Sequence, residues 1–525
     1  MERDNLTAKQ LDYAVFLPAL SGFYATYVGK QRHDPAYVDP ARIPADFENG
    51  IEGLNWLNPD AAYFPYHWAL YSAGHAELDT NKVSPKEDMI RNRDRSRSFV
   101  LGDSGGFQIG KGVWEGDWKN PACPKAQKKR ELVLKWMDAY MDYGMILDIP
   151  AWVCRSPEGR KASGITSYME AVEGTYINND YFMANRTGAC KFLNVLQGEN
   201  HGEAEDWYQR MKKYCDPTQY ERPFNGWAMG GQNMCDVHLI LKRLVALRFD
   251  GLLEKGLHDW MHFLGTSKLE WACLLTDIQR AVRKYHNPNF TVSFDCASPF
   301  LASANGQIYI QTEIENKSKW TYRMVPSVDD KKYATDTRRF RDAVLQDGLF
   351  KAFTESPVSR RCTIKDICIY KPGDLNKINK EGKTSWDSFS YAIQMGHNVW
   401  SHLTAVQTAN QEYDRGIMPA MMHSETADKK TPRNYGTNTF REIADLIFAI
   451  DNREDALALI EYYSAYFQDI RGTRGATGDK AVNAGTMFNS LFESEESEEH
   501  HIDDSGLDES VLDNLENGLV EYNEA

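Results

Sequence analysis

The chain of 525 residues lacks a hydrophobic run long enough to cross a membrane. Its first residues, MERDNLTAK, are charged and lack the apolar core of a signal peptide. These two absences exclude a membrane-spanning class and disfavour a secreted one. We therefore expect a cytoplasmic protein with no membrane partner.

Cysteine is present, but not in a pattern that suits a disulfide framework. The nine cysteines are an odd number and fall at irregular spacing, which is typical of a reducing compartment. A small disulfide-stapled fold is therefore excluded. The length and the hydrophobic content of 42% instead predict a large buried core.

Positive charge is missing from the last part of the chain. No Lys or Arg follows Lys480, whereas 13 acidic residues lie between Glu493 and Glu524, so that the net charge of −15 becomes −2 without them. This composition predicts a disordered acidic tail over residues 481–525. The cations of the body cluster at 91–97, 125–135 and 360–383. Such runs are usually solvated faces, and beside a base-binding pocket they favour phosphate contacts.

Residues 98–110, SFVLGDSGGFQIG, are the most informative segment. An apolar run suited to a buried strand ends at Asp103, and Gly105-Gly106 then let the backbone turn closely past a planar ligand. Phe107 offers a stacking face and Gln108 an amide that can bind a base edge. The plainer alternative is a strand that ends in a turn with a helix-capping Asp.

Six further segments repeat the pattern of an apolar run followed by polar or glycine residues. They are 13–18, 144–150, 191–198, 226–231, 260–266 and 291–299. Helical periodicity lies between several of them, at Lys129–Tyr143, Ala204–Cys215, Val237–Arg248 and Leu269–Tyr285. This alternation predicts a parallel α/β sheet, and about eight such units would close into a (β/α)8 barrel of the TIM type. Asp103, Asp148, Gln197, Gly230-Gly231 and Asp295 would then share the carboxyl ends of the strands, where barrel enzymes act.

Four motifs follow one another in the order of a known family. DSGGFQ at 103–108, VLQG at 195–198, AMGG at 228–231 and SFDCASP at 293–299 resemble the tRNA-guanine transglycosylase superfamily (queuine and archaeosine tRNA-ribosyltransferases). Its members replace guanine in a nucleic acid by a 7-deazaguanine. The resemblance runs from about Ser98 to Pro299, with a weaker echo up to about Gln411.

The resemblance implies a role for each motif residue. Asp295 would be the nucleophile that forms a covalent glycosyl-enzyme, and Asp103 the general acid and base. The base would be held by Ser104, Gly106, Phe107, Gln108, Asp148, Gln197, Gly230 and Gly231. The structural alternatives are a salt-bridged loop acid for Asp148 and a solvated turn residue for Gln197. No organic cofactor is expected.

The resemblance also implies a structural zinc, which that superfamily holds with a C-x-C-x-x-C cluster and a histidine. This chain has no such cluster. It offers Cys362 and Cys368, followed by His397 and His402 on a helical stretch, and a tetrahedral site from these four is chemically reasonable. The alternative is two buried thiols and two histidines on a helix surface, without a metal.

The expected organisation has three parts. A barrel with the catalytic motifs would span 1–340, a zinc-binding subdomain with C-terminal helices 341–480, and the acidic tail 481–525. The strong helical periodicity at 437–471 predicts helices that pack against the barrel.

The nucleic acid is the least determined part of the interpretation. Ala297-Ser298-Pro299-Phe300 follow Asp295 where the tRNA enzymes carry proline-threonine-arginine, and this departure is similar to the branch of bacteriophages and bacterial modification islands that inserts 7-deazaguanines into DNA. We therefore expect DNA and a free base of the preQ0 type as substrates, with a queuine- or preQ1-type tRNA enzyme as the alternative. A homodimer is expected from the family. A catalytically silent subunit and an unrelated barrel enzyme remain open.

Overall fold

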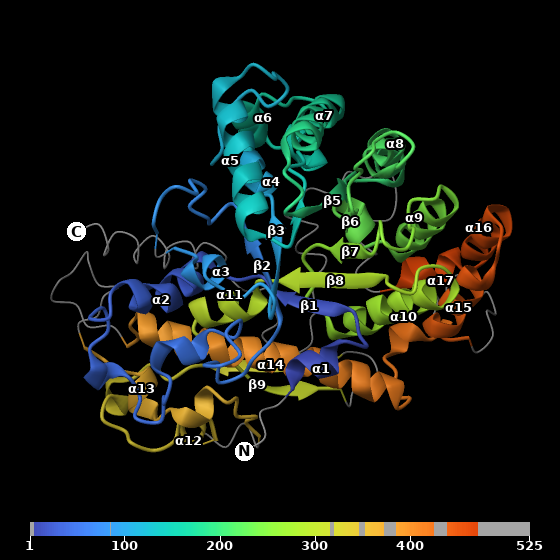
Figure 1. Cartoon of the computed structure of the whole chain (residues 1–525). Coiled ribbons are helices and arrows are strands. Elements are labelled where there is room, and N and C mark those ends of the chain that lie inside the picture. The colour runs from blue at the N-terminus through green and yellow to red at the C-terminus, as the bar shows by residue number, and fades with distance from the viewer. Residues whose placement is uncertain are drawn as a thin grey trace.

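Eight parallel strands form one sheet that nearly closes into a barrel (Figure 1). The computed structural model describes residues 5–84, 86–314, 320–345, 352–371, 385–424 and 438–470. The strands are β1 (Val15–Pro18), β2 (Trp68–Ser72), β3 (Phe99–Asp103), β4 (Tyr143–Met145), β5 (Lys191–Leu196), β6 (Gly226–Met229), β7 (Trp260–Phe263) and β8 (Thr291–Cys296), in the order β1-β8-β7-β6-β5-β4-β3-β2. A bridge between Ala19 and Leu70 links the two ends of this order. The predicted TIM-type α/β fold is confirmed at this level.

Helices cover the outside of the sheet, and polar caps fix where several of them begin. The main outer helices are α2 (Gly22–His33), α5 (Pro124–Tyr140), α7 (Tyr168–Asn185), α8 (His201–Met211), α9 (Val237–Phe249) and α10 (Leu269–Tyr285). Asn200 caps α8 by accepting a hydrogen bond from the Glu203 amide, and Asp236 caps α9 through the Leu239 amide. Both helices therefore begin close to the carboxyl end of the strand that precedes them.

Shorter helices connect or flank these elements. They are α1 (Leu6–Gln10), α3 (Asp88–Arg91), α4 (Gly106–Gly110), α6 (Pro157–Ser163), α11 (Ser298–Ala304), α12 (Phe340–Leu345) and α13 (Ile364–Ile367). Of these, α4 and α11 follow directly on β3 and β8, so they start at the same end of the barrel as the predicted catalytic acids.

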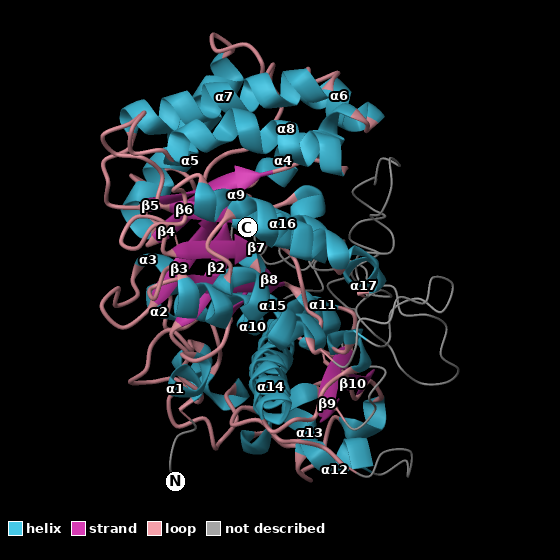
Figure 2. Cartoon of the chain, turned by 90° about the vertical axis from the view of Figure 1, so that its right-hand side faces the viewer, coloured by secondary structure: helices cyan, strands magenta, loops and turns pink. Residues whose placement is uncertain are grey.

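A long helix and a hairpin lie beside the barrel (Figure 2). The antiparallel strands β9 (Gln307–Glu313) and β10 (Thr321–Pro326) contact α14 (Ser388–Asp414), which also packs on α10 and α11. Three further helices are α15 (Phe440–Ala449), α16 (Arg453–Tyr462) and α17 (Ser464–Asp469). Because α15 contacts α10 while α16 and α17 contact α9, the helices predicted at 437–471 do pack on the barrel.

The seven strands predicted from apolar runs are all present, and β2 is the barrel strand that the pattern did not identify; it also did not identify the hairpin strands β9 and β10. Its run of four apolar residues is short and follows a stretch rich in aromatic and polar residues. The boundaries proposed at residues 340 and 480 stay predictions. The acidic tail lies outside the described residues. No helix in the described part of the chain is long and apolar enough to cross a membrane.

Candidate functional site

The predicted site residues gather at one end of the barrel because each follows, or ends, a parallel strand. Asp103 is the last residue of β3, and Asp148 lies three residues beyond β4. Gln197 directly follows β5 and Gly230 directly follows β6. Asp295 is the penultimate residue of β8. All five therefore belong to the carboxyl-end face of the barrel.

Asp103 lies in a buried setting that favours its protonated form. Burial is the main cause that raises its pKa, and the charge of Asp295 adds to the rise. The Ser72 hydroxyl opposes this by donating a hydrogen bond of 2.5 Å to Oδ2. A carboxyl group with a raised pKa, held by a hydroxyl, can carry a proton to and from a bound ligand.

Asp148 and Gln197 form one hydrogen-bonded pair. The Gln197 amide Nε2 donates to Asp148 Oδ2 over 2.8 Å, and both side chains are buried. Burial raises the pKa of Asp148 to about 7, with a further contribution from the charge of Asp103, while the Gln197 hydrogen bond acts against it. The charge of Asp295 affects the pKa of Asp103, and the charge of Asp103 affects that of Asp148. The three carboxyl groups are therefore close enough to interact electrostatically.

Two glycines at this end of the barrel allow neighbouring loops to pack closely against each other's backbone. A Cβ at Gly106 would lie 2.6 Å from the Asp148 carbonyl oxygen. Gly231 has φ +54°, and a Cβ there would lie 2.3 Å from the Gly198 carbonyl oxygen. A side chain at either position would therefore displace the loops that carry Asp148 and Gln197.

Asp295 is held by a chain of hydrogen bonds that begins in the neighbouring strand. The Trp260 indole donates to Ser293 Oγ over 2.8 Å, and Ser293 Oγ lies 2.9 Å from His262 Nδ1. His262 Nε2 lies 3.1 Å from Asp295 Oδ1, which also accepts from the Gly265 amide over 2.9 Å. If the Ser293 hydroxyl donates to Nδ1, then Nε2 carries the hydrogen that is donated to Asp295.

The remaining residues of the DSGGFQ motif line the same region. Ser104 is buried, whereas Phe107 and Gln108 are half-buried. The Phe107 ring lies 5.4 Å from that of Trp152, and Lys111 Nζ lies 4.6 Å from the Phe107 centroid. Gln108 lies against Gly74, where an added Cβ would come within 2.8 Å of its amide nitrogen.

A hollow of about 430 Å³ adjoins this motif and is lined by lysines. Lys82, Lys128, Lys129 and Lys135 contribute to its wall together with Trp114 and Gly74, and two acids, Glu77 and Asp79, line it as well. Lys129 Nζ lies 4.7 Å from the Trp114 ring centroid, and that ring would be 2.7 Å from a Cβ at Gly105. One wall of the hollow therefore packs against the turn that follows Asp103, and its lysines could contact a polyanion there.

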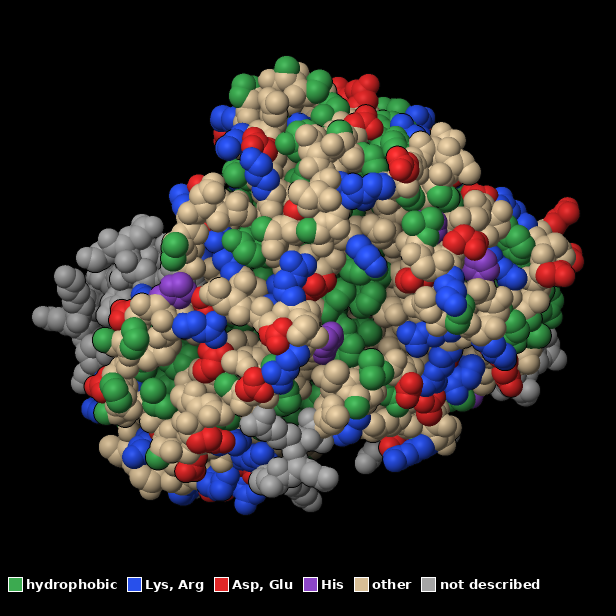
Figure 3. Space-filling model, viewed as in Figure 1, with side chains coloured by type: hydrophobic (Ala, Val, Ile, Leu, Met, Phe, Trp, Pro, Cys, Tyr) green, Lys and Arg blue, Asp and Glu red, His purple; other side chains and the backbone are tan. Residues whose placement is uncertain are grey.

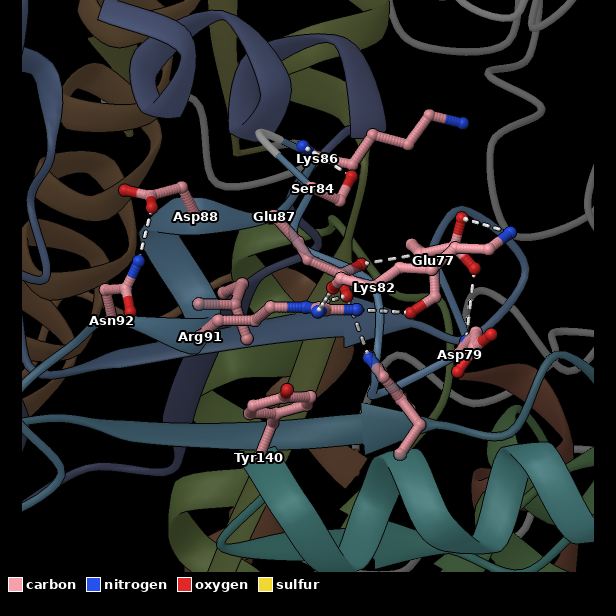
Figure 4. Close-up of polar contacts among 12 residues, drawn as sticks. Glu77, Asp79, Lys82, Ser84, Lys86, Glu87, Asp88, Arg91, Asn92 and Tyr140 are labelled. Atoms are coloured by element: carbon pink, nitrogen blue, oxygen red, sulfur yellow. Dashed lines mark hydrogen bonds and ion pairs between the residues drawn. The ribbon is translucent and has the colours of Figure 1, made fainter. Parts of the chain in front are cut away.

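The arginines that precede β3 are engaged in pairs within the protein. Arg91 donates to the buried Glu87 and to the carbonyl of Glu77, and it lies over the Tyr140 ring (Figure 4). Arg93 and Arg95 both pair with Asp142, which precedes β4. These contacts anchor the loops around β3 and β4, so the basic stretch 91–97 has a structural explanation.

Charge is mixed over the face seen in Figure 3. Lys and Arg side chains alternate there with Asp and Glu, and no patch of a single sign dominates its described part. This face therefore offers a nucleic acid no broad basic surface in its described part.

The four residues predicted to bind zinc do not meet as a metal site. No three of them bring ligand atoms within 4.8 Å of one another, and the group that does so among the described residues lies elsewhere. Cys362 and Cys368 donate to backbone carbonyls. His397 binds Ser356 and the Tyr309 carbonyl, whereas the His402 ring stacks on Phe16 at 4.5 Å. Burial lowers the pKa of His397 to about 4 and that of His402 to about 3. The donor set therefore does not fit the implied zinc, and both histidines act as neutral core residues.

Sequence reasoning missed three polar residues of the site. Ser72 ends the strand that was not identified, and His262 and Ser293 lie in register on β7 and β8. A usable signal was present for the last two, since each is a polar residue between two apolar neighbours in its strand.

Compared with known proteins, the chain matches no protein-family model and no curated protein.

Proposed function

We propose that the protein is a base-exchange glycosyltransferase that replaces guanine in a nucleic acid by a 7-deazaguanine of the preQ0 type. The observation that carries the proposal is the convergence of Asp103, Asp148, Gln197 and Asp295 at one end of the barrel, within electrostatic range of one another. Their side chains supply what the reaction needs: a nucleophile, a proton carrier and a base-binding pair.

Asp295 is assigned as the nucleophile. Both hydrogen bonds that the described residues make to its side chain fall on Oδ1, so Oδ2 is the oxygen that would attack C1′ of the nucleotide. The bond from C1′ to the purine nitrogen breaks in this step, and its electron pair stays on the guanine. A covalent glycosyl-enzyme results, which the incoming base then resolves with net retention.

Asp103 is assigned as the proton carrier. Its raised pKa means that it can deliver a proton to the departing guanine. It then accepts one from the incoming base, so the protons of the two half-reactions balance. The Ser72 hydrogen bond orients the carboxyl group during both transfers.

Asp148 and Gln197 are assigned to the edge of the base. An ionised Asp148 would accept from the N1 and N2 hydrogens of guanine, and the Gln197 amide that donates to it would fix its orientation. Phe107 and Gln108 would contact the base from the DSGGFQ turn. Because ionisation of Asp148 centres near pH 7, base binding should weaken as the pH falls below 7.

The target nucleotide has to leave the stack before C1′ can be reached, at a cost of a few kcal/mol. The lysine-lined hollow beside Gly74 would hold a neighbouring phosphate of the displaced strand. DNA is the proposed substrate because the segment after Asp295 departs from the run of the tRNA enzymes.

The test is exchange of radiolabelled guanine with DNA and with unmodified tRNA, offered separately to the full chain. The expected result is exchange in DNA that Asp295→Asn abolishes. Asp60→Asn is the matched control, because this carboxylate is 74% exposed and pairs with Arg97 ahead of β3. It should leave the rate unchanged.

Each other outcome contradicts a defined part of the proposal. Exchange in tRNA alone would replace DNA by tRNA as the substrate. Exchange that persists in Asp295→Asn would overturn the assigned nucleophile. If neither nucleic acid exchanges, the proposed activity is refuted and a silent subunit becomes the better interpretation.

A further inference from the structure

Two histidines and an aspartate meet at the beginnings of two neighbouring helices. His201 is the first residue of α8, Asp236 caps α9, and His238 is the second residue of α9. Their ligand atoms all lie within 4.8 Å of one another. Because α8 and α9 follow β5 and β6, the cluster lies on the carboxyl-end face, outside the residues assigned to base exchange.

One nitrogen of this cluster is buried without a hydrogen-bond partner. His238 is 6% exposed, and its Nδ1 finds no partner among the described residues. A buried polar atom in that state is costly unless something else satisfies it. His201 Nε2 and Asp236 Oδ2 lie 2.6 Å apart, so the other two members already point at each other.

Hydrogen bonds from neighbouring residues orient the side chains of His238 and Asp236, as is usual for metal ligands. His238 Nε2 lies 3.2 Å from Glu461 Oε1 on α16, which leaves Nδ1 for a ligand. Asp236 Oδ1 accepts from the Leu239 amide over 3.1 Å, and Oδ2 accepts from the Gln232 amide over 2.8 Å. Carboxylates behind a ligating histidine and hydrogen bonds on a ligating carboxylate fix ring orientation and ligand direction.

We propose that His201, Asp236 and His238 bind one divalent transition-metal ion of the Zn²⁺ class. Two imidazoles and a carboxylate are ligands that such ions prefer, and water would complete the coordination. Ligands at about 2.0–2.2 Å in a tetrahedral site are about 3.3–3.5 Å apart. The pair of His201 and Asp236 must therefore open by less than about 1 Å, and the His201 side chain, 41% exposed, is free to move outward.

A bound ion would stiffen the edge of the proposed base-binding pocket. Gln232, which donates to Asp236, directly follows Gly230 and Gly231. Glu461 connects the cluster to the C-terminal helices. The site does not depend on the proposed exchange activity, and it is separate from Cys362, Cys368, His397 and His402.

The test is titration of the chelator-treated full chain with Zn²⁺ by calorimetry, together with the absorption spectrum of the Co²⁺ form. The expected result is one equivalent bound, with a Co²⁺ spectrum typical of low coordination number. His238→Gln and His201→Gln should each weaken the affinity at least about tenfold. His201→Gln guards against misfolding, since its exposed side chain can be replaced without opening the core.

The matched control is His33→Gln. His33 Nε2 lies 2.6 Å from Asp88 Oδ1 and is 31% exposed, so this pair resembles that of His201 and Asp236 but lacks a third ligand among the described residues. It should leave Zn²⁺ binding unchanged. Absence of stoichiometric binding to the wild type, or equal binding by His201→Gln and His238→Gln, would overturn the proposal whatever the result of the exchange assay.

Discussion

Replacement of Asp148 by Asn is expected to stabilise the protein at alkaline pH while it removes a residue assigned to base binding. Burial raises the pKa of Asp148 from 3.8 to about 7. Between these two values the folded protein keeps a proton that the unfolded chain has released. The free energy of unfolding therefore falls as the pH rises, by about 1.4 kcal/mol per pH unit, and this loss levels off above pH 7.

The asparagine variant lacks this titration but keeps a side chain of similar shape that can still hydrogen-bond to Gln197. Relative to the wild type, its free energy of unfolding should increase by about 2–3 kcal/mol between pH 5 and pH 8. Above pH 8 the difference should stay constant. Part of the rise in the pKa of Asp148 comes from the charge of Asp103. In an Asp103→Asn background, the effect of Asp148→Asn on the free energy of unfolding should therefore change less with pH.

Urea denaturation at pH 5, 6, 7, 8 and 9 measures this difference directly. Asp12→Asn is the control, because Asp12 is exposed and its replacement removes a carboxylate without changing a buried site. A constant difference between the Asp148→Asn variant and the wild type across this range would refute the reasoning, since it would mean that the carboxyl group is not buried in the folded protein.

Three further predictions concern the glycine turn, the lysine-lined hollow and the helix histidines. Gly231→Ala should lower the free energy of unfolding by more than about 2 kcal/mol. Gly251 has φ +71° and no atom within 4 Å of an added Cβ, so Gly251→Ala should lower it by only about 1–2 kcal/mol, the cost of the left-handed backbone. Urea titrations of the two variants compare these values. Lys82→Ala should reduce the slope of log affinity for DNA against log salt concentration by about 1. Lys284 pairs with an acid on α15, so Lys284→Ala should leave this slope unchanged. His402→Leu should change stability by less than about 1.5 kcal/mol, because the ring stacks on Phe16 in the core. It should leave the zinc content unchanged, because Cys362, Cys368, His397 and His402 do not bring three ligand atoms together; a lost equivalent of zinc would show that His402 is a ligand after all.

The strands could be predicted from the sequence where apolar runs were long enough to stand out. β5 and β8 have six residues each; Gln197 directly follows β5 and Asp295 is the penultimate residue of β8, so both the strand and its functional end were visible. β2 has five residues after an irregular aromatic stretch, and the same pattern did not separate it. Ser72 was missed with it, because its role depends on the parallel register that sets it beside Asp103.

The residues predicted to bind zinc do not come together in the structure, and the reason is of another kind. Cysteine and histidine types in a suggestive order do not determine which atoms face one another, and the helix that carries His397 and His402 buries both rings in the core. His201, at the start of α8, lies 35 residues before Asp236, which caps α9. The proximity of His201 to Asp236 and His238 therefore depends on the packing of β5 beside β6. No local spacing indicates such a cluster.

The different surroundings of Asp103 and Asp295 decide which acid has which role. Asp295 accepts hydrogen bonds from the Gly265 amide and from a histidine that Ser293 and Trp260 hold in place, and these contacts fix the orientation of its carboxyl group. Asp103 is dominated by burial, which favours its protonated form, and the negative charge of Asp295 reinforces that preference. The charge of Asp295 contributes to the raised pKa of Asp103. In the proposed reaction, attack on C1′ would convert the Asp295 carboxylate into an ester and remove that charge, so Asp103 would release its proton more readily to the departing base. It follows that Asp295→Asn should lower the pKa of Asp103. NMR titration of the Asp103 carboxyl group in the wild type and the variant measures this change. An unchanged pKa would show that the two acids do not interact electrostatically, and it would remove the physical basis for their different roles.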